Sequence, residues 1–200
     1  MGTRALFGLR KDGIDKVVYR QMDGYPEGLG YEFVSMLKHV GINRLNEYFD
    51  KIECITADVP PTKEQIEYCG SMGWIDLSEW SSDTNNWFCL LHKAPNMQYI
   101  GAWQDAIMSD KPVFIENGIN YIKDSRFCEY AYIYDFNSNQ LEFYRGFQRE
   151  PQEGNHYGTK PTVVFERKKY YPCALKALFS KNVIENETVE QITKKMLESK

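Results

Sequence analysis

Residues 130–147 constrain the fold most, because they have the pattern of a β-hairpin whose two faces are both covered. Two strand-like runs, 130–136 and 141–147, flank the polar segment Asn137-Ser138-Asn139-Gln140. Aromatic residues occupy every second position of the first run, and mostly apolar residues stand between them. Successive side chains of a strand point to opposite faces, so this pattern predicts a sheet with cover on either side.

A second hairpin is predicted at the start of the chain. Residues 3–10 and 15–22 are rich in β-forming residues, and Asp12-Gly13 between them is a strong signal for a tight turn. Residues 23–28 break the second strand. After them, apolar residues recur at helical spacing up to Gly41, which predicts an amphipathic helix ending there.

Two capping boxes predict further helices. Thr62 with Gln65 begins a short helix that reaches about Cys69, and Thr188 with Gln191 begins a terminal helix over 188–197. We also expect a helix carrying Leu45, Phe49 and Ile52, a polar loop over 151–160, a helix over 173–179, and short strands over 87–92, 98–102, 113–121 and 162–167.

These elements predict the fold class. No repeat, low-complexity tract or linker divides the chain, so one domain over residues 1–200 is expected. Hairpins combined with clustered helices favour an α+β domain built around an antiparallel sheet.

The charge balance excludes one class of function. The chain has 24 Lys and Arg against 28 Asp and Glu, a formal charge of −4, which is too balanced for a general nucleic-acid binder. Arg167-Lys168-Lys169 before Tyr170-Tyr171 has the pattern of a local nucleic-acid contact. The same pattern is typical of a solvated strand end, so general nucleic-acid binding is not expected.

Membrane, metal and cofactor functions lack sequence signals. No apolar run approaches the roughly 20 residues that cross a bilayer, and the N-terminal segment lacks the apolar stretch of a secretion signal. We therefore predict a cytoplasmic protein without membrane contacts. The five cysteines and three histidines are scattered, with no CxxC pair or HExxH motif, so free thiols, no metal site and no cofactor are expected.

Two segments carry a family resemblance. The chain begins Met1-Gly2-Thr3-Arg4, and residues 19–30 have the form YxxxDxYPxGxG. Together they resemble an uncharacterised family of phage, bacterial and fungal proteins, and residues 127–135 and 141–146 are similar to its later hairpin. The resemblance implies a phage or bacterial origin, with the host cytoplasm as location if the protein is phage-encoded, and no catalytic residue.

Residues 1–30 are also similar to N-terminal-nucleophile amide hydrolases of the bile-acid-cleaving type. Arg20 and Asp23 match the Arg and Asp that lie near the first residue of those enzymes. Gly2 stands where they need a nucleophilic Cys, Ser or Thr, so Thr3 would serve only after removal of Gly2. The resemblance implies a hydrolase-like fold and keeps enzymatic activity open.

The turn over residues 23–30 is the best candidate for a binding site. Its glycines permit close backbone approach, the following helix start favours an anion, and nearby arginines and tyrosines offer charge and stacking. A rigid strand-to-helix connection is the alternative. We predict a small anionic or nucleotide-like ligand, which a phage protein would sequester as a host defence signal. The expected ligand-binding residues are Arg4, Tyr19, Arg20, Asp23, Tyr25 and His156.

This site hypothesis makes a local prediction. If Arg4 and Arg20 both face the turn, at least one is partly buried and matched by a carboxylate. Asp23 and Glu27 are the nearest carboxylates in the sequence.

Two other functions are compatible with the sequence. A hydrolase of an amide or phosphodiester would use Asp23 or His156 as general base, with Thr3 as nucleophile in an autoprocessed form. A protein-interaction or inhibitor module would dock exposed tryptophans on a host protein or on a second copy. Those tryptophans are Trp74, Trp80 and Trp87, for which burial in the core is the alternative.

Overall fold

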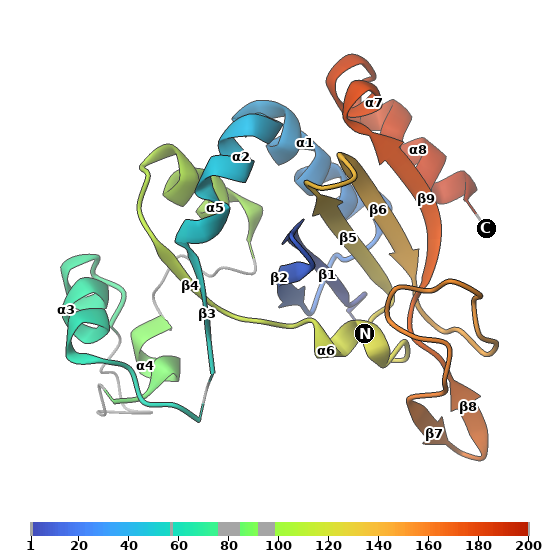
Figure 1. Cartoon of the computed structure of the whole chain (residues 1–200), viewed down its shortest axis with the longest axis horizontal. Coiled ribbons are helices and arrows are strands. Elements are labelled where there is room, and N and C mark those ends of the chain that lie inside the picture. Colours follow the sequence, from blue (N-terminus) through green and yellow to red (C-terminus); the bar gives the residue numbers. More distant parts are fainter. Residues whose placement is uncertain (1, 57, 76–84, 92–98, 200) are drawn as a thin grey trace.

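The computed structural model describes residues 2–56, 58–75, 85–91 and 99–199, and a five-stranded sheet forms its centre (Figure 1). The strand order is β2-β1-β5-β6-β9, and the β1–β5 pair is parallel whereas the other three pairs are antiparallel. The predicted α+β class is confirmed, but the sheet is mixed rather than antiparallel throughout. The strands are β1 (Ala5–Lys11), β2 (Ile14–Arg20), β5 (Tyr130–Asp135), β6 (Gln140–Arg145) and β9 (Ala174–Ser180).

Both predicted hairpins are present. Asp12 (φ 51°) and Gly13 (φ 75°) are left-handed, as a two-residue turn between twisted strands requires. In the second hairpin Tyr130 lies opposite Arg145, and Asp135 lies opposite Gln140. Parallel pairing of β1 with β5 needs a long crossover, and most of the helices belong to that crossover.

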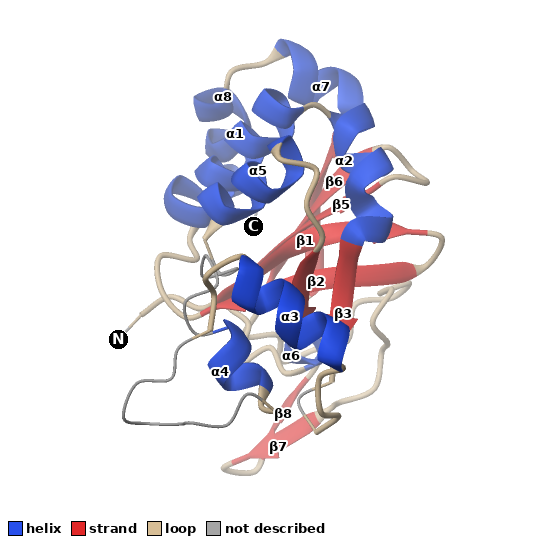
Figure 2. Cartoon of the chain, turned by 90° about the vertical axis from the view of Figure 1, so that its left-hand side faces the viewer, coloured by secondary structure: helices blue, strands red, loops and turns tan. Residues whose placement is uncertain are grey.

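Helices cover one face of the sheet, as Figure 2 shows. The first long helix follows a π-helical turn, η1, and ends at Gly41 (φ 84°), the predicted position. The capping boxes of Thr62 and Thr188 are also confirmed. The covering elements are η1 (Pro26–Gly30), α1 (Tyr31–Val40), α2 (Ile42–Tyr48), α5 (Ile100–Met108), α7 (Lys181–Asn186) and α8 (Val189–Glu198).

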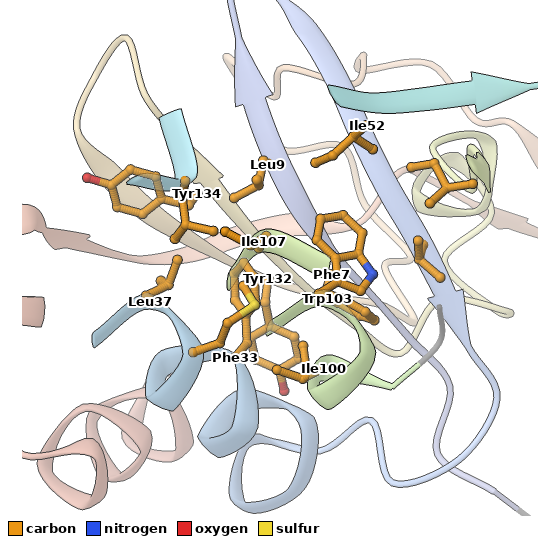
Figure 3. Packing of buried hydrophobic residues seen from close by; sticks show 14 of the residues in the cluster. Phe7, Leu9, Phe33, Leu37, Ile52, Ile100, Trp103, Ile107, Tyr132 and Tyr134 are labelled. Atoms are coloured by element: carbon orange, nitrogen blue, oxygen red, sulfur yellow. The ribbon is translucent and has the colours of Figure 1, made fainter. Parts of the chain in front are cut away.

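The main core lies between this helical layer and the sheet (Figure 3). Phe7 of β1 packs on Phe33 of α1 and on Trp103 of α5, with ring centroids 5.9 and 5.4 Å apart. Burial of such large rings supplies most of the stabilisation available to a domain of this size.

The other face of the sheet carries a smaller core. Leu6, Val17, Ala131 and Ile133 lie there under α6 (Asn120–Lys123) and the segment after β6, including Tyr157. Because β1 and β5 bury side chains on both faces, the cover inferred from residues 130–147 is confirmed.

No helix in the described ranges has the length and apolar character needed to span a bilayer.

Smaller elements flank the main sheet. A parallel pair, β3 with β4, lies beside α3 and α4, and a two-stranded antiparallel arm of β7 and β8 projects from the opposite side (Figure 1). The bounds are η2 (Phe49–Lys51), β3 (Ile52–Ile55), α3 (Lys63–Ser71), α4 (Trp87–Leu91), β4 (Val113–Glu116), β7 (Val163–Phe165) and β8 (Lys168–Tyr170).

Several predicted elements are of the wrong type. The strands expected over 87–92 and 98–102 are helical in their described parts, α4 and the start of α5, while His92 and Gln98 lie outside the described residues. Short apolar runs fit a buried helix as well as a strand. The helix expected over 173–179 is strand β9, because pairing with β6 overrides the helix propensity of its Ala and Leu residues. The strand expected over 113–121 ends at Glu116, and Ile52 begins β3 instead of continuing a helix.

Candidate functional site

A hollow of about 240 Å³ lies where β5 begins and β6 ends, beside β9. Both hairpin strands and the irregular edge strand contribute side chains to it. It is lined by Glu129, Tyr130, Arg145, Gly146, Phe147, Gln148 and Lys176.

Arg145 provides one positive charge of the hollow. It lies opposite Tyr130 in the β5–β6 register, and its guanidinium sits over the Tyr130 ring, 5.8 Å from the centroid. The Tyr130 ring also stacks on Phe143, with centroids 6.0 Å apart, so packed aromatic rings support the guanidinium. Arg145 forms no ion pair with any residue that the structure describes.

Lys176 provides the second charge, and an irregularity of β9 places it there. Phe143 pairs with Ala177 whereas Tyr144 pairs with Leu175, so Lys176 is the extra residue of a β-bulge. Bulges re-aim side chains and are common beside functional sites. Within the described ranges, Lys176 also has no carboxylate partner.

The rim of the hollow is a strained turn directly after β6. A Cβ on Gly146 would lie 1.9 Å from the carbonyl oxygen of Cys128, so only glycine fits there. Phe147 follows with φ 56°, held by an amide hydrogen bond of 2.7 Å to the Ser125 carbonyl, and 54% of it is exposed. An exposed aromatic in a left-handed conformation costs about 1–2 kcal/mol, and such strain concentrates at functional sites.

The remaining wall is polar and held in place. Glu129 Oε1 accepts hydrogen bonds from the backbone amide and from Nε of Arg4, at 3.2 and 3.3 Å. Gln148 Nε2 donates to the carbonyls of Arg145 and Gly146, at 3.1 and 2.8 Å. The hollow is therefore preorganised by contacts that leave the charged groups of Arg145 and Lys176 unengaged.

The structure does not bring Arg4 and Arg20 into a shared pocket. Arg20 pairs in register with Ala5 and lies on the helical face, where Glu32 accepts from it at 2.5 and 3.2 Å. Arg4 is one residue earlier in an extended chain, so it points to the opposite face, towards Glu129. Each arginine is matched by a carboxylate, but the partners are Glu32 and Glu129 and not the predicted Asp23 and Glu27.

Tyr19 lies on the same face as Arg4. Its ring stacks on Tyr121, with centroids 4.4 Å apart. Burial raises the pKa of Tyr19, and the nearby Arg4 guanidinium opposes that shift. Of the predicted ligand-binding residues, these two are therefore neighbours, and Arg4 reaches the hollow only through Glu129.

The glycine-rich turn is a packed strand-to-helix connection. The Asp23 carbonyl accepts from the Leu29 amide at 2.8 Å, and a Cβ on Gly28 would lie 2.4 Å from that carbonyl oxygen. The Gly24 carbonyl accepts from the buried Tyr132 hydroxyl at 2.9 Å. The glycines thus serve close packing, while the side chains of Asp23 and Tyr25 are exposed and do not line the hollow.

The proposed catalytic residues are also separated. His156 is exposed, and its ring lies nearly perpendicular to the Tyr157 ring, with centroids 4.9 Å apart. Tyr157 contacts Arg10, near the end of β1 that is distant from the turn over residues 23–30. Six residues of strand separate Arg4 from Arg10, which Tyr157 contacts, and correspond to about 20 Å. Thr3 is half-buried, and its carbonyl accepts from the Gly24 amide at 2.9 Å. His156 is thus not brought together with Asp23 and Thr3.

Two of the three tryptophans proposed for docking are in the core. Trp74 packs edge-on against Tyr68, and Trp87 Nε1 donates to the Val59 carbonyl at 2.9 Å. Trp80 lies outside the described residues.

Comparisons of the chain with protein-family models, with curated proteins and with solved structures find no match. Both family resemblances therefore stay predictions. Within the described ranges, no three His, Cys, Asp or Glu side chains are grouped so that they could hold a metal ion. The function must be inferred from the geometry of the hollow.

Sequence reasoning did not identify the cations of the hollow. A signal existed for Arg145, which the hairpin pattern places on the aromatic face of its strand, where an unpaired charge is unusual. None existed for Lys176, because residues 173–179 were expected to form a helix and a bulge has no local signature.

Proposed function

We propose that this protein binds a small anionic, nucleotide-like molecule in the hollow between β5, β6 and β9. The observation that carries the proposal is the pair of cations, Arg145 and Lys176, which have no carboxylate partner in the described chain and share one hollow. Buried or half-buried cations are normally paired, so an unpaired couple favours an anion as the missing partner.

The size and lining indicate the ligand class. At about 240 Å³ the hollow is smaller than the clefts that enclose drug-sized ligands, about 300–1,000 Å³, so a compact molecule fits best. The planar guanidinium of Arg145 suits two oxygens of a phosphate. Tyr130 already contacts Phe143 and Arg145, so the exposed Phe147 ring is assigned to stacking on a base.

The lining favours binding over turnover. Its seven residues include no Ser, Thr, Cys or His, and the carboxylate among them, Glu129, is engaged by Arg4. A hydrolase would need a nucleophile or a free general base at the ligand. Sequestration of a host signal by a phage protein, which the family resemblance suggests, needs tight binding without turnover and agrees with this lining.

Calorimetric titration tests the proposal with inorganic phosphate, mononucleotides, and cyclic mono- and dinucleotides. We expect binding of at least one nucleotide, weakened tenfold or more by Arg145→Gln and less by Lys176→Gln, because a charged hydrogen bond contributes about 1.5–3 kcal/mol. The matched control is Lys63→Gln at the exposed start of α3, which should bind like the wild type.

The ligand recovered after titration separates binding from hydrolysis. Chromatography should return the intact nucleotide, whereas a cleaved product would favour the hydrolase alternative. Absence of heat with every ligand at high protein concentration would remove the proposal, and so would equal binding by wild type and Arg145→Gln.

A further inference from the structure

The arm formed by β7 and β8 carries an excess of exposed cations. Arg167, Lys168 and Lys169 are exposed, and the described chain offers none of them an ion-pair partner. The arm projects from the main sheet (Figure 1) and is tied to it where the Thr162 hydroxyl donates to the Lys123 carbonyl. These charges contrast with the net −4 of the whole chain.

Arg126 packs against two aromatic rings of the arm and against the neighbouring Phe127. The Arg126 guanidinium sits over the rings of Phe127, Phe165 and Tyr170, at 5.3, 4.8 and 5.5 Å from their centroids. Asp124 pairs with this guanidinium at 3.1 Å and neutralises its charge. Arg126 therefore serves to position the rings and is not counted among the free cations. Phe127 and Phe165 remain 44% and 48% exposed, with ring surface open to solvent.

Arg149 adds a fourth free cation next to the arm. Its guanidinium lies 3.7 Å above the Tyr170 ring, and no described carboxylate pairs with it. Stacking on Tyr170 limits the rotamers of Arg149, while the amide of Tyr171 donates to the Gln148 carbonyl at 3.1 Å and fixes the adjoining backbone. In the β7–β8 register Phe165 lies opposite Lys168, so Lys168, Phe165 and Tyr170 share one face of the arm, which Arg126 and Arg149 contact. Lys169 lies opposite Val164 on the other face.

We propose that this face of the arm, together with Arg126, Phe127 and Arg149, binds single-stranded nucleic acid. Unpaired cations complement backbone phosphates, and exposed Phe rings offer stacking platforms for bases. A duplex hides its base faces, and an acidic peptide would use the charges while leaving the rings exposed. The proposal concerns a site separate from the hollow and does not depend on the small ligand.

The test uses fluorescence anisotropy of a labelled single-stranded thymidine oligonucleotide, 12 nucleotides long, with the full chain. If Arg149, Lys168 and Arg167 of the adjoining turn each neutralise one phosphate, the logarithm of the association constant should fall with a slope of about −2.1 against the logarithm of the salt concentration. Between 50 and 200 mM NaCl the affinity should then fall about 20-fold.

Variants of the arm separate charge from stacking. Lys168→Gln should reduce the slope to about −1.4, and the matched control Lys169→Gln, on the other face of the arm, should leave it unchanged. Phe165→Leu keeps an apolar side chain but loses the ring, so affinity should fall about fivefold or more. Phe165→Trp should restore it.

Three outcomes would overturn the proposal. One is no binding of the oligonucleotide at 50 mM NaCl, and another is unchanged binding in both the Lys168→Gln and the Phe165→Leu variants. The third is equal affinity for a duplex of the same length or for a polyglutamate peptide. Arg145→Gln should not alter oligonucleotide binding, so failure at the arm and failure at the hollow are distinguishable.

Discussion

Two arginines on the central strands have opposite surroundings. Arg10, near the end of β1, is 4% exposed and donates to Asp15 and Glu142, both at 2.8 Å, and to the Tyr157 hydroxyl. Arg145, at the end of β6, faces a hollow and has no carboxylate partner among the described residues. The same residue type thus holds the structure together at one end of the sheet and is left available for a ligand at the other.

The electrostatics of Arg10 explain this difference. Burial by itself disfavours its charge, but Tyr157, Asp15 and Glu142 outweigh that effect and raise the pKa of the guanidinium. Glu142 also accepts from the Tyr144 hydroxyl at 2.7 Å. Because Tyr157 belongs to the segment after β6, this closed network fixes that segment against the sheet.

The largest expected effect comes from replacing Arg10. Arg10→Met would leave Asp15 and Glu142 without their buried partner, which should lower the free energy of unfolding by about 3–5 kcal/mol. Arg145→Met breaks no ion pair of the described chain and should change it by less than about 0.5 kcal/mol. Urea unfolding followed by circular dichroism measures both. Equal destabilisation by the two variants would contradict the comparison.

The rim of the hollow gives the next largest effect. A Cβ on Gly146 would overlap the carbonyl oxygens of Cys128 and Ser125, at 1.9 and 2.6 Å, so the backbone must shift. Gly146→Ala should lower the free energy of unfolding by about 2–3 kcal/mol. The control Gly101→Ala, at an exposed position of α5, introduces no contact within 4 Å and has no left-handed backbone, so it isolates the steric part of the effect. Equal losses in both variants would rule out crowding at Gly146.

Local turn and capping chemistry explains why parts of the fold were predictable. Asp12-Gly13 specifies a turn, and Thr62 and Thr188 each cap a helix through bonds within three residues. The strand β9 was missed, because its Ala and Leu residues favour a helix and pairing with β6 is a long-range contact. The parallel β1–β5 pair has no local signal for the same reason.

The candidate site was less predictable than the fold. Glycines near arginines suggested an anion site at residues 23–30, but these glycines serve packing, and Arg20 is occupied by Glu32. The hairpin pattern placed Arg145 on the aromatic face, but the hollow also depends on a bulge at Lys176 and on the left-handed Phe147, neither of which has a sequence signature. Whether a charged side chain is paired depends on residues distant in the sequence, so an unpaired charge is identified only in the folded structure.

Alkaline pH should lower the free energy of unfolding by a smaller amount, through the tyrosines of the network around Arg10. Burial raises the pKa values of Tyr144 and Tyr157 above the ordinary value of 10. These tyrosines keep their protons in the folded state while the unfolded chain loses them, so their contribution is complete below pH 10 and declines above it. Each should remove about 1 kcal/mol of stability between pH 10 and pH 11.

Urea unfolding at the two pH values measures this decline, with Tyr157→Phe as control. The variant should show a decline smaller by about 1 kcal/mol, since one titrating hydroxyl is gone. A decline equal to that of the wild type would mean that Tyr157 titrates normally in the folded protein, and the network around Arg10 would then be open to water.

The smallest expected effect tests whether the strained rim of the hollow lowers stability but is needed for binding. Phe147 is left-handed and mostly exposed, so Phe147→Gly relieves backbone strain while losing little buried surface. The relief of about 1–2 kcal/mol is partly offset by the greater chain entropy of glycine, and a net stabilisation of about 0.5–1 kcal/mol should result.

If the ring stacks on the ligand, the same variant should bind the nucleotide about fivefold more weakly. Phe147→Asn, which tolerates the left-handed region but lacks the aromatic ring, should behave alike in both measurements. A destabilised Phe147→Gly would show that the ring supports the fold, and unchanged binding would remove Phe147 from the site while leaving Arg145 and Lys176 in it.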